Sequence, residues 1–370
     1  MEEKFEIDAE DVAHESATFK ESARRSAALW EDLPKNPAKY RVLTGERPTG
    51  PLHVGHLFGT VANRVRIQNL GATTFIVIAD YQVLTDRDTA DAVNANVNEV
   101  LLDYLAAGLD PETGRTHIFS HSHVPELNQL LLPFMSLVTT AELDRNPTVK
   151  EEIKAAGLRQ VNALMYTYPI HQAADILFCK GNVVPVGRDQ LPHLELTRKI
   201  ARRFNERFSP KAPIFPVPDA LLSELPVVLG TDGQKMSKSR NNAIMLKMTA
   251  DETAKALKGA KTDNDRNITY DPQGRPEVAN LLRLIAICTN DTPEAVAARI
   301  GDGGGGKLKS TLTEALNAYL APLRERRARF AADPGYVKGV LAKGVARARE
   351  EGVASLREVR KVMSMDHGLD

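Results

Sequence analysis

Apolar residues in the first half of the chain gather in short runs, which are separated by longer segments with helical spacing of apolar positions. Residues 74–80 are almost continuously apolar, which is typical of a parallel strand buried on both faces. In chain order we expect a strand at 40–44, a Gly/Pro turn at 45–51, a helix at 54–70, the strand at 74–80, a helix at 90–107 closed by Gly108, and a strand at 117–120. This order predicts an α/β fold with a doubly wound, Rossmann-like parallel sheet, whose ligands bind at the carboxyl ends of the strands.

The pattern changes at about residue 249, where strand signals end and helical periodicity continues. The helices are predicted at 252–258, 276–288, 293–300, 308–330, 335–350 and 353–363, with the glycine-rich segment 301–307 as a flexible connection. We therefore divide the chain into an N-terminal extension (1–38, acidic and then helical to about Trp30), a Rossmann-like catalytic domain (39–228), a lysine loop (229–248) and a C-terminal helical domain (249–370). The last helix is a candidate to pack back on the catalytic domain.

Composition and charge narrow the class of protein. The 370 residues carry 48 basic and 48 acidic side chains, and this zero net charge argues against a broad cationic surface for nucleic acid. Residues 321–350 hold the densest local group of arginines and lysines, which a solvated helix face explains equally well.

Cysteine usage and hydropathy indicate the compartment. Only Cys179 and Cys288 occur, so we expect neither a disulfide framework nor a zinc or iron–sulfur site. No run of 18 apolar residues occurs, so we expect no membrane span, and the acidic first 15 residues are unlike a targeting leader. We expect a reducing, cytoplasmic setting.

The segment His53-Val54-Gly55-His56 is the first of two that carry chemistry. It begins the helix expected after the first strand, where backbone N–H groups and the helix dipole favour phosphate. Both imidazoles can donate hydrogen bonds to phosphate oxygens, and Gly55 lets the backbone approach a bulky ligand. A capping or metal-binding histidine pair is the alternative, although no carboxylate or cysteine at matching spacing supports a metal.

The second segment is Lys235-Met236-Ser237-Lys238-Ser239, in a polar, glycine-bearing stretch that we expect to be an exposed and mobile loop. Alone it would indicate only a solvated turn. Paired with His53 and His56, it is predicted to bring Lys235 and Lys238 against the leaving pyrophosphate of a nucleotide.

The two segments resemble the paired signatures of the class I aminoacyl-tRNA synthetases, in the order and separation that this family shows. These enzymes activate an amino acid with ATP and then transfer it to tRNA, with Mg²⁺ bound through the phosphates. The resemblance implies a homodimer, with tRNA crossing from the helical domain of one subunit to the active site of the other. In the helical domain, the basic stretch 321–350 is a hypothetical contact for tRNA phosphates, which charge reversal of Arg326 and Arg327 would test.

Between the signatures, the segments 168–177, 184–190 and 191–198 resemble the tryptophanyl-tRNA synthetases, and the likeness extends from about residue 40 to 366. Tyr168, Gln172 and Asp175 have helical spacing, so all three can face one pocket. Asp175 could accept a hydrogen bond from an indole N–H, and a buried acceptor would reject phenylalanine. A surface salt bridge is the alternative for Asp175.

The resemblance also assigns residues one by one. It places Asp175 on the indole nitrogen, Tyr168 and Gln190 on the α-amino group, Asp189 on the ATP ribose, and Gly187 beside adenine or ribose. The further candidates for the tryptophan site are Leu43, Gln82, Gln172, Ile176, Val184 and Val186, and those for the ATP site are Arg47, Thr49, Gly55, His56, Met236 and Ser237. Arg47, Gln82 and Gln172 stand where glutamine, histidine and methionine are common, which implies a branch with a more polar pocket rim.

Three other functions stay open on the sequence. A tyrosyl-tRNA synthetase fits because a phenol also donates to an aspartate; a synthetase-like paralogue could bind tryptophan as a regulator; and a small nucleotidyltransferase can carry a similar histidine motif. The two intact signatures and the helical region favour the function that the resemblance implies: formation of tryptophanyl-adenylate, then transfer to the 3′-terminal adenosine of tRNA(Trp). His117, His121 and His123 could suggest a metal site, but we favour a polar strand end.

Overall fold

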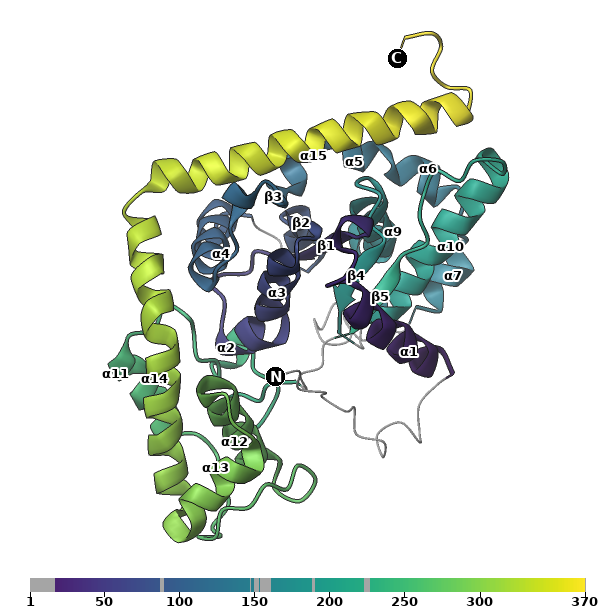
Figure 1. The fold of residues 1–370 in the computed structure, drawn as a ribbon. Coiled ribbons are helices and arrows are strands. Elements are labelled where there is room, and N and C mark those ends of the chain that lie inside the picture. Colours follow the sequence, from purple (N-terminus) through teal and green to yellow (C-terminus); the bar gives the residue numbers. More distant parts are fainter. Residues whose placement is uncertain are drawn as a thin grey trace.

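The computed structural model describes residues 17–86, 90–146, 148–149, 153, 161–187, 190–222 and 227–369. Its centre is a five-stranded sheet of order β3-β2-β1-β4-β5, in which every pairing is parallel (Figure 1). The strands are β1 (Arg41–Glu46), β2 (Thr73–Ile78), β3 (Thr116–Ser120), β4 (Val183–Val186) and β5 (Asp219–Leu222). The predicted doubly wound parallel sheet is therefore confirmed, with β1 at its centre.

The helices fall into an N-terminal, a central and a C-terminal group. The first two are α1 (Ala17–Asp32), α2 (Val54–His56), α3 (Ala62–Leu70), α4 (Val93–Ala107), α5 (Pro125–Gln129), α6 (Leu131–Met135), α7 (Thr140–Asp144), α9 (Ala163–Leu177) and α10 (Leu191–Phe208). The C-terminal group is α11 (Ala250–Lys258), α12 (Pro276–Thr289), α13 (Pro293–Ile300), α14 (Gly304–Ala331) and α15 (Pro334–Val362). Single 3-10 turns lie at Pro37–Lys39, Tyr81–Thr85, Pro111–Thr113, His121–His123, Lys238–Arg240 and Gly301–Gly303, and a π turn at Leu57–Val61 joins α2 to α3.

Alternating side chains of β2 fill two separate cores. Ile76 and Ile78 pack with α4 and the C-terminal helices, whereas Phe75 and Val77 pack with α9 and α10. Side chains alternate between the two faces of a strand, so the sheet has helices on both faces, as its apolar run predicts. Among the described residues, no helix is long and apolar enough to span a membrane.

The last helix is longer than predicted. The segments 335–350 and 353–363 form the one helix α15, which crosses the outer strand β3 (Figure 1). The helix runs on through Gly352, where the absence of a side chain leaves room for Glu126. A Cβ at position 352 would lie 2.7 Å from the Cβ of Glu126. The predicted flexible connection at 301–307 is also wrong, since a 3-10 turn and the first turn of α14 occupy it.

The N-terminal helix α1 covers the β5 edge of the sheet. Ser26 Oγ accepts a hydrogen bond from Leu222 N (2.8 Å), and Arg25 pairs with Asp219 (3.1 Å). An exposed edge strand invites pairing with other chains. The described part of the N-terminal extension therefore protects the sheet, and the boundaries proposed for the domains stay predictions.

Candidate active site

His53 and His56 form a reciprocal cap at the start of α2. The backbone N–H of His56 donates to His53 Nδ1 (3.3 Å), and the backbone N–H of His53 donates to His56 Nδ1 (3.2 Å). Both Nδ1 atoms accept, so each neutral ring carries its proton on Nε2. The predicted alternative of a capping pair is thus true, and it leaves one N–H donor on each ring for a ligand.

Both histidines are neutral at physiological pH. Burial lowers the pKa of His53 to about 3, and it also lowers the pKa of His56. Lys235 and Lys238 lie close enough to His56 for their charges to oppose its protonation. The positive charge near this helix start therefore comes from the lysines, while the imidazoles offer directed hydrogen bonds.

A buried polar cluster supports the first strand behind His56. Arg64 donates to Tyr104 (2.7 Å), to Thr44 (3.0 Å) and to Glu46 (3.3 Å), and Arg64 is 2% exposed. The hydrogen-bonding capacity of a buried arginine must be satisfied, so this cluster fixes the carboxyl end of β1 against α3 and α4. Single-sequence reasoning missed these residues because no local pattern distinguishes a buried arginine.

The lysine loop is organised around Asn242, which is 2% exposed. Its side chain accepts from Ser237 N (2.8 Å) and donates to Asp232 (2.7 Å) and to the Lys235 carbonyl (3.2 Å). The expected exposure of the loop is confirmed for Lys235 and Ser239, whereas Met236, like Asn242, is buried. Asn242 was missed because an asparagine in a polar loop looks like any turn residue.

The two signature segments meet in the structure. Lys238 Nζ donates to the Gly50 carbonyl (3.0 Å), just before the histidine segment. The chain after the loop also pairs with that segment, since Val54 N donates to Ile244 O (2.9 Å) and Leu246 N donates to Leu52 O (3.0 Å). A Cβ at Gly55 would lie 3.0 Å from the His53 ring and 3.6 Å from Met236, so only glycine allows this approach without a shift.

Asp103 connects this site to the C-terminal helices. Its Oδ2 accepts from Leu52 N (2.6 Å), and its Oδ1 accepts from Arg327 Nε of α14 (2.7 Å). Arg327 also donates to Glu99 (2.9 Å), and Arg326 donates to the Ala106 carbonyl (2.7 Å). Both side chains therefore fasten α14 to α4, and the hypothesis that the basic stretch 321–350 contacts tRNA phosphates stays a prediction.

Asp175 lies on α9 and is 4% exposed. The alternative of a surface salt bridge is thus excluded, since its ion-pair partner is the fully buried His121, with Nε2 2.9 Å from Asp175 Oδ1. On the same helix, Tyr168 is 8% exposed, and its hydroxyl lies 2.8 Å from His193 Nε2. Because Asn146 donates to His193 Nδ1 (3.1 Å), the proton of His193 is on Nε2 and is directed at Tyr168.

The histidines at the end of β3 do not converge as a group. His117 packs on Phe75, and His123 bonds to Ser120 (3.0 Å). In the described part of the chain, a group with ligand atoms within 4.8 Å of one another comprises His121, His171 and Asp175. Both ring nitrogens of His171 are already bonded, to Gln82 (3.2 Å) and Asn128 (2.7 Å), so we assign no metal to this group.

The remaining predicted residues lie as follows. Four apolar candidates belong to one apolar cluster around α9: Leu43, Ile176, Val184 and Val186. Gln172, Gly187, Gln190 and Thr49 are half-buried, and Asp189 lies outside the described residues. Arg47 is exposed and bonds to Thr85 and Asp86 (both 3.1 Å), which places it beside the turn that carries Gln82.

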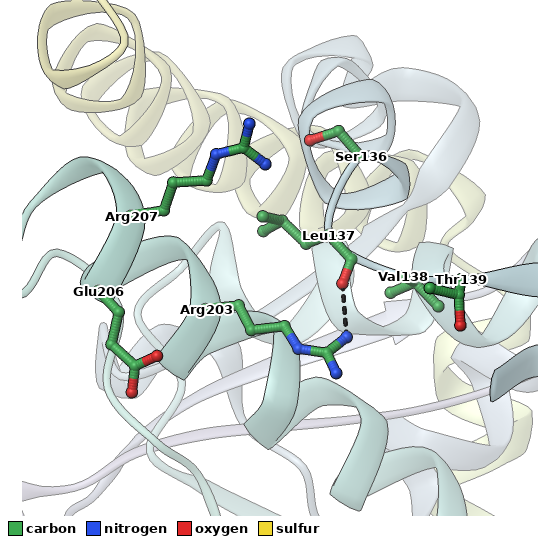
Figure 2. A pocket seen from close by; sticks show the side chains of 7 residues that line it. All are labelled: Ser136, Leu137, Val138, Thr139, Arg203, Glu206 and Arg207. Atoms are coloured by element: carbon green, nitrogen blue, oxygen red, sulfur yellow. Dashed lines mark hydrogen bonds between the residues drawn. The ribbon is translucent and has the colours of Figure 1, made fainter.

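A surface hollow of about 490 Å³ lies elsewhere, between α10 and the segment that joins α6 to α7 (Figure 2). Its lining residues are Ser136, Leu137, Val138, Thr139, Arg203, Glu206 and Arg207. Arg203 is bound there to the Leu137 carbonyl (2.6 Å) and to Glu142 (2.8 Å). The hollow contains neither signature segment, and the hydrogen bonds of Arg203 join α10 to the segment around α7. We therefore do not take the hollow as the candidate site.

Comparisons with known proteins agree with this geometry. Residues 35–321 match the family described as tRNA synthetases class I (W and Y), and the chain belongs to this family. The tryptophan–tRNA ligases of Clostridium longisporum and Treponema pallidum (strain Nichols) are each 40% identical to it, over 341 and 334 residues. These matches cover 89% and 88% of this chain and 98% and 97% of those proteins. The structure of tryptophanyl-tRNA synthetase from Campylobacter jejuni complexed with ADP and tryptophan is similar with a TM-score of 0.75 at 29% identity, covering 88% of this chain and 99% of that one.

Proposed function

We propose that this chain is a tryptophan–tRNA ligase, which forms tryptophanyl-adenylate from L-tryptophan and ATP and then charges tRNA(Trp). The tryptophan carboxylate attacks the α-phosphorus of ATP, and pyrophosphate leaves. The 3′-terminal ribose hydroxyl of tRNA then attacks the activated carbonyl, and AMP leaves. The observation that carries the proposal is the meeting of the histidine segment and the lysine loop beside the carboxyl end of β1.

At the phosphate end, we assign directed hydrogen bonds to His53 and His56 and charge neutralisation to Lys235 and Lys238. The reciprocal cap supports this division, because it fixes both rings with Nε2–H as the remaining donor. Donors that are already in place where charge develops need no reorganisation during the reaction. Catalysis then consists of positioning and charge stabilisation, without a covalent enzyme intermediate.

Mg²⁺ would be held by the phosphates of ATP. Glu46 is the acid whose charge acts on His56, and it is already bonded to Arg64 (3.3 Å) and Thr60 (3.0 Å). Mg²⁺ prefers oxygen ligands and commonly takes them from substrate phosphates. The nitrogen donors of the histidine segment and lysine loop fit the remaining phosphate oxygens. Gly187 and Asp189 are assigned to the nucleoside on the family resemblance.

At the amino-acid end, we assign Asp175 to the indole N–H and Tyr168 and Gln190 to the α-amino group. The burial of Asp175 and the apolar cluster of Leu43, Ile176, Val184 and Val186 support an aromatic substrate. Gln82 donates to His171 (3.2 Å), and we assign it to a polar rim with Gln172 and Arg47. A homodimer in the cytoplasm, with tRNA on the C-terminal helices, completes the proposal.

Amino-acid-dependent ATP–pyrophosphate exchange across all twenty amino acids tests the proposal. We expect exchange with tryptophan alone, followed by charging of total tRNA. Lys238→Met should lower kcat by roughly 100-fold or more, since it removes a donor aimed at the developing charge. Lys247→Met is the matched control, because Lys247 pairs with Glu99 (3.2 Å) and is half exposed. Exchange with tyrosine, or exchange without any charging of tRNA, would contradict the proposal.

A further inference from the structure

We propose that His121 is a specificity-determining residue, which holds the Asp175 carboxylate in place as the acceptor for the indole N–H of tryptophan. This inference rests on the proposed function of Asp175. His121 is the first residue of the 3-10 turn that follows β3, so the strand delivers it to the carboxyl edge of the sheet. Asp175 reaches the same place from α9, 54 positions later in the chain.

The contact between the two side chains is close and dry. His121 Nε2 lies 2.9 Å from Asp175 Oδ1, and the side chains are 0% and 5% exposed. Within the described part of the chain, neither nitrogen of His121 nor this oxygen makes a hydrogen bond of good geometry. The two groups thus lie at ion-pair distance with hydrogen-bonding capacity unused, in a place that water reaches poorly.

A buried carboxylate needs a partner in order to stay ionised. His171 cannot serve, because its Nδ1 accepts from Gln82 and its Nε2–H donates to Asn128. Its two bonds fix a neutral ring, and burial lowers the pKa of His171 further. Among the described residues, His121 is the one basic side chain at ion-pair distance from Asp175.

The charge of Asp175 decides which substrates the site can accept. An ionised carboxylate only accepts hydrogen bonds, so a ligand without an N–H leaves a buried charge unpaired. Sites built to hydrogen-bond a substrate group strongly reject an analogue that lacks the group. A carboxylate that His121 no longer holds in place can turn away from such an analogue, which reduces this penalty. Replacing His121 should therefore relax discrimination more than it weakens the remaining contacts.

The test compares tryptophan with β-(benzothiophen-3-yl)alanine, in which sulfur replaces the indole N–H. ATP–pyrophosphate exchange by the full chain gives kcat/KM for each, and we expect the wild type to prefer tryptophan by roughly 100-fold or more. His121→Leu should lower kcat/KM for tryptophan about tenfold or more through KM, while the value for the analogue changes less than about threefold. The KM for ATP should stay the same, because the contacts of His121 are with Asp175, His171 and Tyr81, none of which is assigned to ATP.

Three further variants make the result specific. His121→Gln places an amide N–H at about the reach of His121 Nε2, so it should retain discrimination within about threefold. His121→Asn is too short to reach Asp175 and should behave like His121→Leu, which keeps the test valid where the leucine variant is unstable. His123→Leu is the matched control, because this exposed neighbour bonds to Ser120 and Ser122 (both 3.0 Å).

Unchanged discrimination in folded His121→Leu or His121→Asn, with a wild type that activates tryptophan, would overturn the role of His121 alone. Absence of tryptophan-dependent exchange by the wild type would overturn the proposed function, and this inference with it. An equal loss for tryptophan and the analogue would also overturn it, since that result indicates a structural role.

Discussion

The ion pair between Asp103 and Arg327 is the contact whose removal should connect stability to catalysis. Asp103 is fully buried and Arg327 is 14% exposed, and their atoms are 2.7 Å apart. Burial raises the pKa of Asp103, whereas Arg327 and the Leu52 N–H oppose that rise. The pair therefore compensates a real desolvation cost at the junction of α4 and α14.

The magnitude follows from what each variant leaves behind. Removing one partner of a buried pair costs about 3–5 kcal/mol. Asp103→Asn keeps an oxygen that accepts from the Leu52 N–H, and Arg327 keeps its contact with Glu99. We therefore expect this variant to lose only about 2 kcal/mol of unfolding free energy. Arg327→Met leaves the charge of Asp103 buried with the backbone N–H alone, and here we expect about 3–4 kcal/mol. The double variant should recover about 1–2 kcal/mol of the summed loss.

Urea unfolding and ATP–pyrophosphate exchange measure the two consequences. Asp103 holds the turn before His53, so we expect KM for ATP to rise about three- to tenfold in Asp103→Asn while KM for tryptophan changes less. Lys343→Met is the control, because Lys343 forms an exposed pair with Glu112 and should cost less than about 0.5 kcal/mol. The reasoning is refuted if Asp103→Asn is as stable as that control and binds ATP normally.

Three further predictions concern α15, the histidine segment and the lysine loop. Gly344→Ala should lower the free energy of unfolding by about 1–3 kcal/mol, because the new Cβ would overlap the Ile118 carbonyl. Gly339→Ala on the same helix is the control: its Cβ has open space, so the variant should be neutral or stabilising in thermal unfolding. Burial lowers the pKa of His53 to about 3. As pH drops, the His53 ring is protonated near pH 6.5 in the unfolded chain but stays neutral in the folded chain. The free energy of unfolding should therefore fall by up to about 1.4 kcal/mol per pH unit between about pH 6.5 and 3. His53→Gln should flatten that slope in urea unfolding at pH 7, 6 and 5. Asn242→Ala should lower kcat/KM for ATP about tenfold in pyrophosphate exchange and leave KM for tryptophan within twofold; equal effects on both would contradict an ordering role.

The local features of the fold were predictable because their causes lie within a few residues. The apolar run at 74–80 became β2, Gly108 closes α4 in the left-handed conformation, and Pro293–Ile300 matches its predicted bounds. Predictions failed where packing outweighed local preference. Glycine favours a break at position 352, but the close approach of α15 to Glu126 requires a small residue inside a continuous helix.

The residues of the candidate site also fall into two groups, those that the sequence indicates and those that only the structure reveals. Residue types, spacing and the family resemblance selected His53, His56, Lys235, Lys238 and Asp175 as candidates, since each belongs to a segment whose neighbours carry the signal. Their supporting residues gave no such signal. Arg327 looked like a surface cation, and only its 224-position contact with Asp103 shows that it is part of the interior.

The chain by itself determined the order of strands and helices, and it supplied the two segments that we propose to face phosphate and the carboxylate that we propose for an aromatic substrate. Only the tertiary structure decided which imidazole lies against that carboxylate, which proton tautomer each histidine keeps, and which arginines are buried. The physical reason is the range of the forces. Periodicity, caps and turns act between near neighbours, whereas the cost of burying a polar group depends on partners from distant parts of the sequence.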